Sequence, residues 1–240
     1  MANKQGCLNC RSSEFLGVEC AWPALRCVAS AEIRMRPYTV WRRRVLMAVT
    51  ALILLFGTWQ VGQAAYIHAK AQLAQLLIEQ AWKKTLAGDN QVRPWSWADT
   101  WPVARLSVPA RDIELYVLAG SSDRTIAFGP GHVFGTPLPG ESGNSVIGAH
   151  RDTHFAFLQW LEDGEEIEVQ DARGVDLRYR VAYSKVVDKT DVSVMSARTD
   201  GDRLTLVTCY PFNALTSGGR LRYVVVAQPV PTEKSYGFSS

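Results

Sequence analysis

The sequence predicts a closed all-β barrel that follows an N-terminal transmembrane helix. Two observations lead to this fold class. Seven or eight short runs with strand character occupy residues 103–230, and no long helical patterns alternate with them. Before them lies an apolar run, Val45–Tyr66, whose 22 residues would reach about 33 Å as a helix, enough to cross a bilayer core of about 30 Å.

A basic cluster directly before the apolar run predicts how this helix is oriented. Its members are Arg34, Arg36, Arg42, Arg43 and Arg44. Arginines of this kind stay in the cytoplasm, so residues from about 67 onward are expected on the other side of the membrane. We expect an uncleaved anchor because the run is long for a signal core, although the small residues of Gly62–Ala65 leave cleavage open.

The first 34 residues differ from the rest of the chain and have no clear role. They contain Cys7, Cys10, Cys20 and Cys27. Cys7 and Cys10 have the spacing of half a zinc site, but the second pair is spaced more widely and no histidine lies nearby. Met35 is an alternative start, which would make residues 1–34 an upstream extension.

The remaining segments follow from composition. Alanine and leucine at helical spacing predict a stalk helix over 67–87 that Gly88-Asp89-Asn90 ends. The stretch 93–102 holds three tryptophans and is expected to be a linker whose tryptophans pack on the domain. The predicted organisation is a segment 1–34, a basic flank and anchor 35–66, a stalk and linker 67–102, a barrel 103–230 and a tail 231–240.

The predicted strands are short and are bounded by glycine, proline and charged turns. In chain order they are 103–108, 113–118, 145–148, 165–169, 175–187, 203–208 and 221–227. The turn signal Ala172-Arg173-Gly174 predicts a hairpin between the fourth and the fifth. A short helix is expected over 155–161. About 130 residues are enough to bury a core.

Cys209 is the most evident candidate for a catalytic residue. It ends an apolar alternating run, and no other cysteine follows residue 27. On the exported side of a membrane, this thiol has no partner for a structural disulfide. Two interpretations remain at this point: a small buried apolar residue or a nucleophile.

A cysteine nucleophile needs a base, and histidine is the usual one. His68 lies in the predicted stalk, and His132 lies in a turn-rich stretch where we expect it at the surface. His150 ends a strand and His154 follows four residues later. Because Cys209 also ends a strand, the two strand ends could bring it to His150 on one barrel rim.

Two further sets of side chains with possible chemistry occur near these residues in the sequence. Asp152 with the nearby histidines makes only a weak metal site, so we predict no metal and expect Asp152 to cap the short helix. Arg222 begins the last strand, and Arg220 lies two residues earlier. An arginine stays charged and has several donors, which suits the oxyanion of an acyl transfer.

Three motifs between Ala104 and Pro229 resemble the sortase family of cysteine transpeptidases. The segment Gly129–Phe155 looks like the family's segment around its catalytic histidine, here His150. Thr205-Leu206-Val207-Thr208-Cys209 looks like the signature that ends in the nucleophile, and Arg222–Ala227 is similar to the strand that begins with the catalytic arginine. The surroundings of His150 and Cys209 most resemble the Gram-negative, proteobacterial type.

The resemblance implies an eight-stranded β-barrel enzyme of the thiol peptidase class, held in the bacterial inner membrane with its catalytic domain in the periplasm. Cys209 would attack the Thr–Gly bond of an LPxTG-like sorting signal, and an amine acceptor would resolve the acyl-enzyme. His150 would be the general acid or base, and Arg222 would stabilise substrate and oxyanion. The resemblance implies no cofactor. Further candidates for substrate contacts are Thr208, Tyr210 and Arg220.

Two rival functions stay open from the sequence alone. The same site in a cysteine hydrolase would use water in place of the amine, since the choice of acceptor depends on how well water is excluded. A membrane-tethered β-barrel binding module would instead carry a buried, inert thiol. The net charge of +3, with no basic face that includes aromatic residues, argues against nucleic acid.

Overall fold

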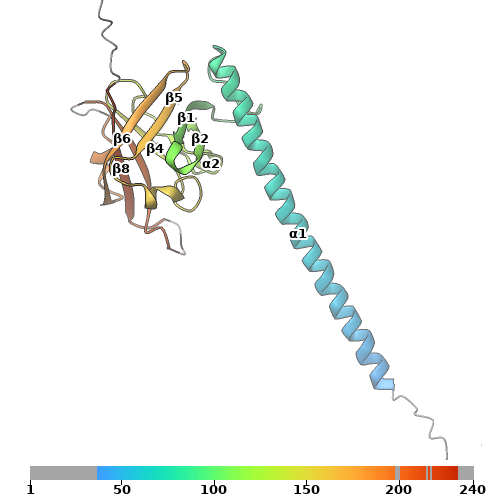
Figure 1. The fold of residues 1–240 in the computed structure, drawn as a ribbon. Helices are drawn as coiled ribbons and strands as arrows, with labels where there is room; N and C mark the ends of the chain where they lie inside the picture. The colour runs from blue at the N-terminus through green and yellow to red at the C-terminus, as the bar shows by residue number, and fades with distance from the viewer. Residues whose placement is uncertain (1–36, 198–200, 215, 217, 232–240) are drawn as a thin grey trace, which may run out of the picture. The chain divides into compact units, whose positions relative to one another are not determined.

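The computed structural model describes residues 37–197, 201–214, 216 and 218–231, which include a long helix and a closed eight-stranded β-barrel (Figure 1). The predicted fold class is therefore confirmed. The chain divides into two compact units between Phe56 and Gly57, within the helix. The four N-terminal cysteines, with their weak zinc spacing, and the alternative start at Met35 lie outside the described residues.

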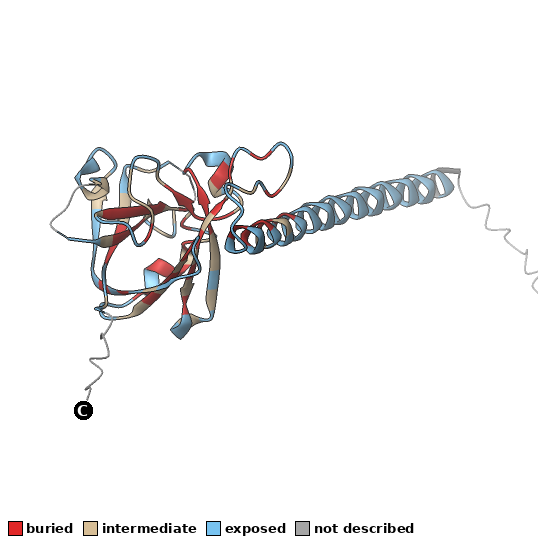
Figure 2. Ribbon diagram, turned by 90° about the horizontal axis from the view of Figure 1, so that it is seen from above, coloured by how far each residue is buried: buried red, intermediate tan, exposed pale blue. Residues whose placement is uncertain are grey.

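Helix α1, Pro37–Leu86, joins the predicted anchor and the predicted stalk helix without a break. Its side chains are exposed from Val40 to Leu73, as the pale blue part of the helix in Figure 2 shows. The helix is long and apolar enough to cross a membrane. It ends just before Gly88, whose φ of 105° lies in the left-handed region that favours glycine.

The last turns of α1 belong to the second unit and bury one face there. Ile78 and Trp82, one helical turn apart, are almost fully buried. Gln75 Nε2 donates a hydrogen bond of 2.7 Å to the carbonyl oxygen of Phe128. The ring of Trp95 meets the Phe128 ring edge to face at 5.0 Å. The predicted packing of the linker tryptophans is confirmed for Trp95 and is wrong for Trp97, which is 83% exposed.

The barrel strands follow the predicted runs and include one that the sequence pattern did not indicate. The strands are β1 Pro102–Val108, β2 Ile113–Ala119, β3 Gly131–His132, β4 Asn144–Gly148, β5 Glu166–Asp171, β6 Asp176–Asp188, β7 Arg203–Tyr210 and β8 Leu221–Pro229. The additional strand is β3, which at two residues is too short to show alternation. The short helices are η1 Pro109–Arg111, α2 Asp123–Ile126, η2 Ala156–Trp160 and η3 Val192–Met195.

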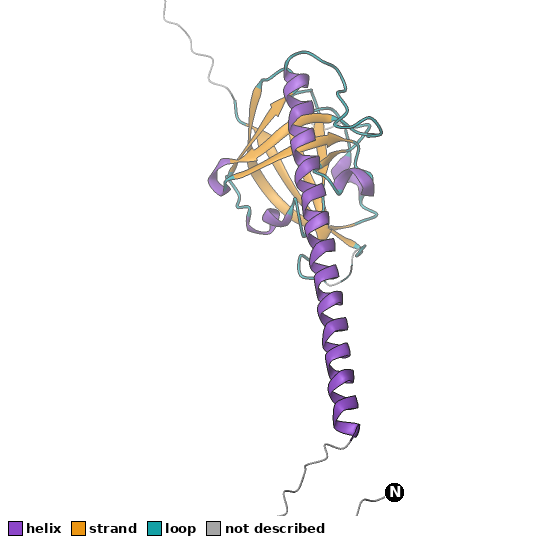
Figure 3. Ribbon diagram, turned by 90° about the vertical axis from the view of Figure 1, so that its right-hand side faces the viewer, coloured by secondary structure: helices purple, strands orange, loops and turns teal. Residues whose placement is uncertain are grey.

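The order of strands around the barrel is β1-β2-β3-β4-β7-β8-β6-β5, and the sheet closes on itself (Figure 3). β4 and β7 are parallel neighbours, with Gly148 opposite Val207. β7 and β8 are antiparallel neighbours. Parallel pairing brings the carboxyl ends of β4 and β7 to the same edge, and the antiparallel pair adds the start of β8.

Alternation along the strands separates an interior from an exterior face. In β1 the inward residues Ala104, Leu106 and Val108 are fully buried, and the residues between them are only partly buried. The expected helix over 155–161 is present as the 3₁₀ helix η2, which buries Phe157 and Leu158. Other members of the core are Ile167, Val169, Leu204, Leu206, Val225 and Ala227.

Candidate active site

Cys209 is the penultimate residue of β7 and lies on the outer face of the barrel. The residues of opposite parity, Leu204, Leu206 and Thr208, are almost fully buried. Cys209 itself is half-buried, and it is not in a disulfide. The alternation of the strand therefore keeps the thiol out of the apolar interior and within reach of solvent.

Arg222 lies directly across the sheet from Cys209, because the β7–β8 register pairs these two residues. Directly opposed residues on antiparallel strands have Cβ atoms about 4.5–5.5 Å apart. The guanidinium Nη1 donates to the carbonyl oxygens of Gly219 at 2.7 Å and Leu221 at 3.0 Å. Within the described part of the chain the other guanidinium nitrogens have no hydrogen-bond partner, so they can donate to a ligand beside the thiol.

His150 reaches the same edge through the parallel pair of β4 and β7. After β4 ends, Ala149 N donates to Val207 O at 3.2 Å, and Thr208 Oγ1 donates to Ala149 O at 2.7 Å. These two hydrogen bonds fix the backbone just before His150 against the backbone just before Cys209. The tight turn that follows is closed by Phe155 N, which donates to His150 O at 2.9 Å.

One pocket of about 480 Å³ collects these three side chains. Besides Cys209, His150 and Arg222, its lining comes from the segment around α2, from η3 and from the loop before β8. The other lining residues are Ser121, Asp123, Ile126, Val133, Gly148, Ala149, Met195, Val207, Thr208 and Gly218. Asp123 is the one carboxylate among these described residues. An imidazole, a thiol and a guanidinium around one cavity supply the base, the nucleophile and the oxyanion donor that cysteine acyl transfer needs.

The two other histidines of the barrel have different roles. Burial and then the charge of His150 lower the pKa of His154, so this second imidazole stays neutral near pH 7. The expectation of a surface position for His132 is wrong: it is buried in β3, and burial lowers its pKa. Its Nε2 lies 2.9 Å from Pro137 O and 3.2 Å from Thr136 Oγ1, which satisfies the ring inside the domain.

The candidate substrate contacts lie in three different environments. Thr208 lines the pocket, but its hydroxyl is engaged with Ala149 O. Tyr210 stacks on Tyr223, with ring centroids 6.2 Å apart, and does not line the pocket. Arg220 is outside it too: its Nη2 lies 3.0 Å from Asp188 Oδ2, with 81% of the arginine side chain exposed.

Asp152 does not cap the short helix, which corrects the expectation from the sequence. The N-cap of η2 is Phe155, without a side-chain hydrogen bond, and Asp152 is exposed three residues earlier. The hydrogen bond from Phe155 N to His150 O occupies the donor that a cap would have used. Over the described part of the chain, no three His, Cys, Asp or Glu side chains gather as a metal would need.

Arg151 is a site residue that the sequence reasoning missed. Only 6% of it is exposed, and its Nη2 donates to Ala214 O at 2.9 Å and to Thr216 O at 2.6 Å. It therefore joins the turn of His150 to the loop that runs from Cys209 to Arg222. An arginine directly after the candidate base was the only sequence signal that could have indicated this role.

Replacement of Arg151 by methionine is expected to lower kcat/KM at least about 10-fold, because two loop carbonyls lose a charged donor worth about 1–3 kcal/mol. Arg151→Lys should recover part of the activity, since an ammonium can reach one carbonyl. Steady-state kinetics and thermal melting on the same samples provide the check. If Arg151→Met melts earlier but each folded molecule turns over at the normal rate, the residue is structural only.

Comparison with known proteins agrees with this fold. The family model of the sortase domain matches residues 106–230. Sortase D of Bacillus subtilis (strain 168) is 30% identical over 125 residues, which is 52% of this chain and 62% of that relative, so less than two thirds of its length is matched.

Two solved structures have a similar fold. Sortase A from Corynebacterium diphtheriae aligns with a TM-score of 0.51 and 28% identity, covering 62% of this chain and 70% of that one. The Clostridium perfringens sortase D5 transpeptidase aligns with a TM-score of 0.50 and 25% identity, covering 64% and 89%. Because the family model covers half of the chain, the protein belongs to the sortase family, whose members are cysteine transpeptidases.

Proposed function

We propose that this protein is a membrane-anchored cysteine transpeptidase in which Cys209 is the nucleophile, His150 the general acid and base, and Arg222 the group that stabilises substrate and oxyanion. The observation that supports this is the single pocket that these three residues line, although they come from separate parts of the chain. A buried, inert thiol would favour a binding module, but Cys209 is half-buried at the pocket wall.

The proposed reaction has two balanced halves. The Cys209 thiol loses its proton to His150, and Sγ attacks the carbonyl carbon of the scissile peptide bond. The C–S bond forms, the C–N bond breaks, and His150 gives the proton to the leaving amine. An acceptor amine then attacks the thioester and loses a proton through His150, which restores the thiol. Arg222 donates hydrogen bonds to the carbonyl oxygen as its negative charge develops.

The substrate that we propose is a protein with an LPxTG-like sorting signal, cleaved between Thr and Gly, and the acceptor is an amine. The surroundings of His150 and of Cys209-Tyr210-Pro211-Phe212 favour the Gram-negative type. The arginine cluster before the apolar part of α1 supports the further proposal that the anchor lies in an inner membrane and the barrel in the periplasm. We keep the organisation 1–34, 35–66, 67–102, 103–230 and 231–240 as part of the proposal.

The direct test uses the full chain in detergent with a sorting-signal peptide. Mass spectrometry should show the acyl part of the peptide on Cys209, and an added amine should convert it into a peptide–amine conjugate. Release of the free acid alone, even with excess amine, would establish the hydrolase. An unlabelled Cys209 that also fails to react with alkylating reagents at neutral pH would establish the binding module.

The assignment of Arg222 has its own test, because Arg220 is a matched control two residues away. Arg222→Ala is expected to lower kcat about 10²–10³-fold, the usual loss for an oxyanion donor. Arg220→Ala should stay within about twofold, since its exposed ion pair with Asp188 contributes about 0–1 kcal/mol. Both are compared by steady-state kinetics at saturating peptide. The reverse ranking would transfer the role to Arg220.

A further inference from the structure

A second, smaller pocket lies on the same outer face of the barrel as Cys209. Its volume is about 90 Å³. Thr205, which precedes Cys209 by four residues on β7, is part of its lining. The other lining residues come from β4, β6, η3, the start of β7 and β8, and are Asn144, Tyr183, Lys185, Ser193, Val194, Arg203 and Val226.

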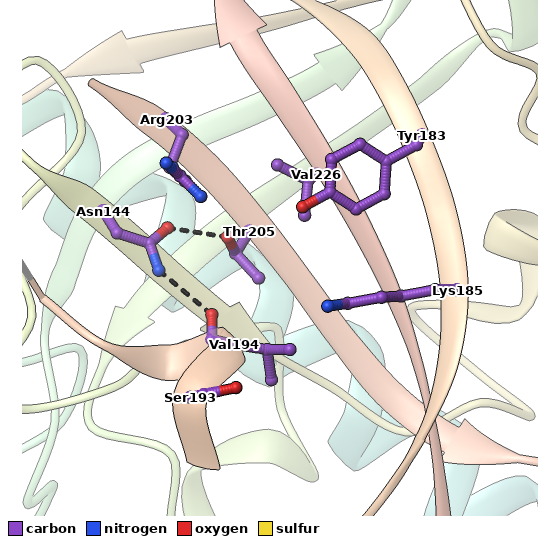
Figure 4. A pocket seen from close by; sticks show the side chains of 8 residues that line it. All are labelled: Asn144, Tyr183, Lys185, Ser193, Val194, Arg203, Thr205 and Val226. Carbon is purple, nitrogen blue, oxygen red and sulfur yellow. Dashed lines mark hydrogen bonds between the residues drawn. The ribbon is translucent and has the colours of Figure 1, made fainter. Parts of the chain in front are cut away.

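The side-chain amide of the buried Asn144 links the strands of this pocket to η3 by hydrogen bonds. Asn144 is 1% exposed, and its Oδ1 accepts a hydrogen bond of 2.6 Å from Thr205 Oγ1. Its Nδ2 donates to Val194 O at 3.1 Å (Figure 4) and to Ser196 O, also at 3.1 Å. These bonds fix η3 to the starts of β4 and β7, so the pocket is a built feature of the fold.

The pocket is positively charged. Figure 4 shows the Lys185 amino group and the Tyr183 hydroxyl reaching from β6 across β8 toward Thr205, with the Arg203 guanidinium on the opposite side. None of the lining residues is acidic. Among the described residues, no carboxylate forms an ion pair with Lys185 or Arg203.

Asp191 is close enough to feel the charge of Lys185, and its carboxylate accepts hydrogen bonds from Ser193 at the pocket wall. Hydrogen bonds from Ser193 are the main reason that the pKa of Asp191 is lowered, and the charge of Lys185 is the smallest of the causes. Two cations and a phenol around a small polar cavity are suited to a carboxylate, which accepts several charge-assisted hydrogen bonds.

The place of the pocket relative to Cys209 tells which part of a substrate can reach it. β4 and β7 run parallel, with His150 beyond their carboxyl ends and the Asn144–Arg203 pair at their starts. In the proposed reaction His150 protonates the leaving amine, so the leaving side of the substrate lies toward the carboxyl ends. The acylated side then runs along β7 toward the pocket.

Thr205 and Cys209 are four positions apart on β7, which is about 13 Å at about 3.3 Å per residue. An extended Leu-Pro-x-Thr motif has about the same length. If the Thr carbonyl lies at Cys209, the residues just before Leu therefore lie near Thr205. We propose that the pocket binds an acidic side chain one or two residues before the sorting motif, held by Lys185 and Arg203. This inference rests on the proposed function and adds a specificity determinant to it.

The experiment compares peptides that differ only in charge. The full chain in detergent is given sorting-signal peptides with Glu or Gln in each of the two positions before the motif. We expect a kcat/KM about three- to tenfold higher for the better Glu peptide, mainly through KM, as for partly exposed charge pairs. The preference should shrink in 1 M salt, where the screening length is about 3 Å. It should also vanish when Glu is moved three residues further from the motif.

Variants then assign the preference to the pocket. The double variant Lys185→Met/Arg203→Met should lose the preference, so that the Glu and Gln peptides react at equal rates, and thermal melting of the same sample reports its folding. If the double variant does not fold, each single variant should lose part of the preference. Arg178→Gln removes an exposed cation near the other end of β6 and should change nothing.

The possible outcomes distinguish a failure of the acidic subsite from a failure of the proposed transpeptidase function. Equal rates for Glu and Gln peptides with an active enzyme would overturn the acidic subsite and leave the transpeptidase standing. A preference that survives in the double variant would overturn the role of Lys185 and Arg203. If neither peptide forms an adduct on Cys209, the proposed function fails, and the subsite falls with it.

Discussion

Cys209→Ala is expected to abolish acyl-enzyme formation and to reduce turnover by at least about 10⁴-fold, the scale seen when a covalent nucleophile is removed. The reason is that no other thiol follows residue 27. The fold should survive, because Cys209 lies on the outer face while Leu204 and Leu206 fill the core from the other face. Intact-mass spectrometry with a sorting-signal peptide, steady-state kinetics and thermal melting measure the three parts of this prediction.

The N-terminal cysteines provide the matched control. Cys27→Ala removes a thiol that precedes the barrel in the sequence, and it should retain full activity and the adduct. Peptide mapping of the wild-type adduct must then locate the acyl group on the peptide that contains Cys209. Turnover by Cys209→Ala at more than about one percent of the wild-type rate would show that another group carries the reaction.

Much of the barrel was predictable because its strands are amphipathic. β1 alternates between buried and partly buried residues, β7 does so from Leu206 to Cys209, and the predicted runs 103–108 and 203–208 agree with the two strands closely. β3, α2 and η3 were missed, because elements of two to four residues have no measurable period. The parallel pair of β4 and β7 was also invisible, since its partners are far apart in the chain.

The sequence named the three residues of the candidate site but not how they are arranged in space. Strand ends indicated that Cys209 and His150 could share a rim, and one pocket holds both. The two arginines before and at the start of β8 could not be separated from the sequence. Register separates them: Arg222 pairs with Cys209, while Arg220 extends to Asp188 on β6.

Other features of the site depend on contacts between distant segments, which a sequence pattern does not indicate. Met195 and Asp123 enter the pocket from η3 and α2, the short elements that had no period. His132 was expected at the surface because glycines and prolines surround it. It is buried because Pro137 O and Thr136 Oγ1 satisfy its ring, and such partners become visible only when the turn is folded.

His150→Ala is expected to lower kcat/KM about 10²–10⁴-fold, the usual contribution of a positioned acid and base. The leaving amine needs a proton as the C–N bond breaks, and His150 is the one histidine among the described residues that line the pocket. His154→Ala is the matched control. Because burial lowers the pKa of His154 and it lies outside the pocket lining, we expect a loss below about fivefold.

The choice of substrate separates proton transfer from a structural role of His150. An activated aryl ester of the same Leu-Pro-x-Thr acyl group has a leaving group that departs without a proton. If His150 acts as the acid, His150→Ala should lose at least about tenfold less on this ester than on the peptide, since the missing step is not needed. Equal losses on both substrates would mean that His150 acts by activating or placing Cys209. The acid role would then belong to another group at the pocket, with Asp123 the first to examine.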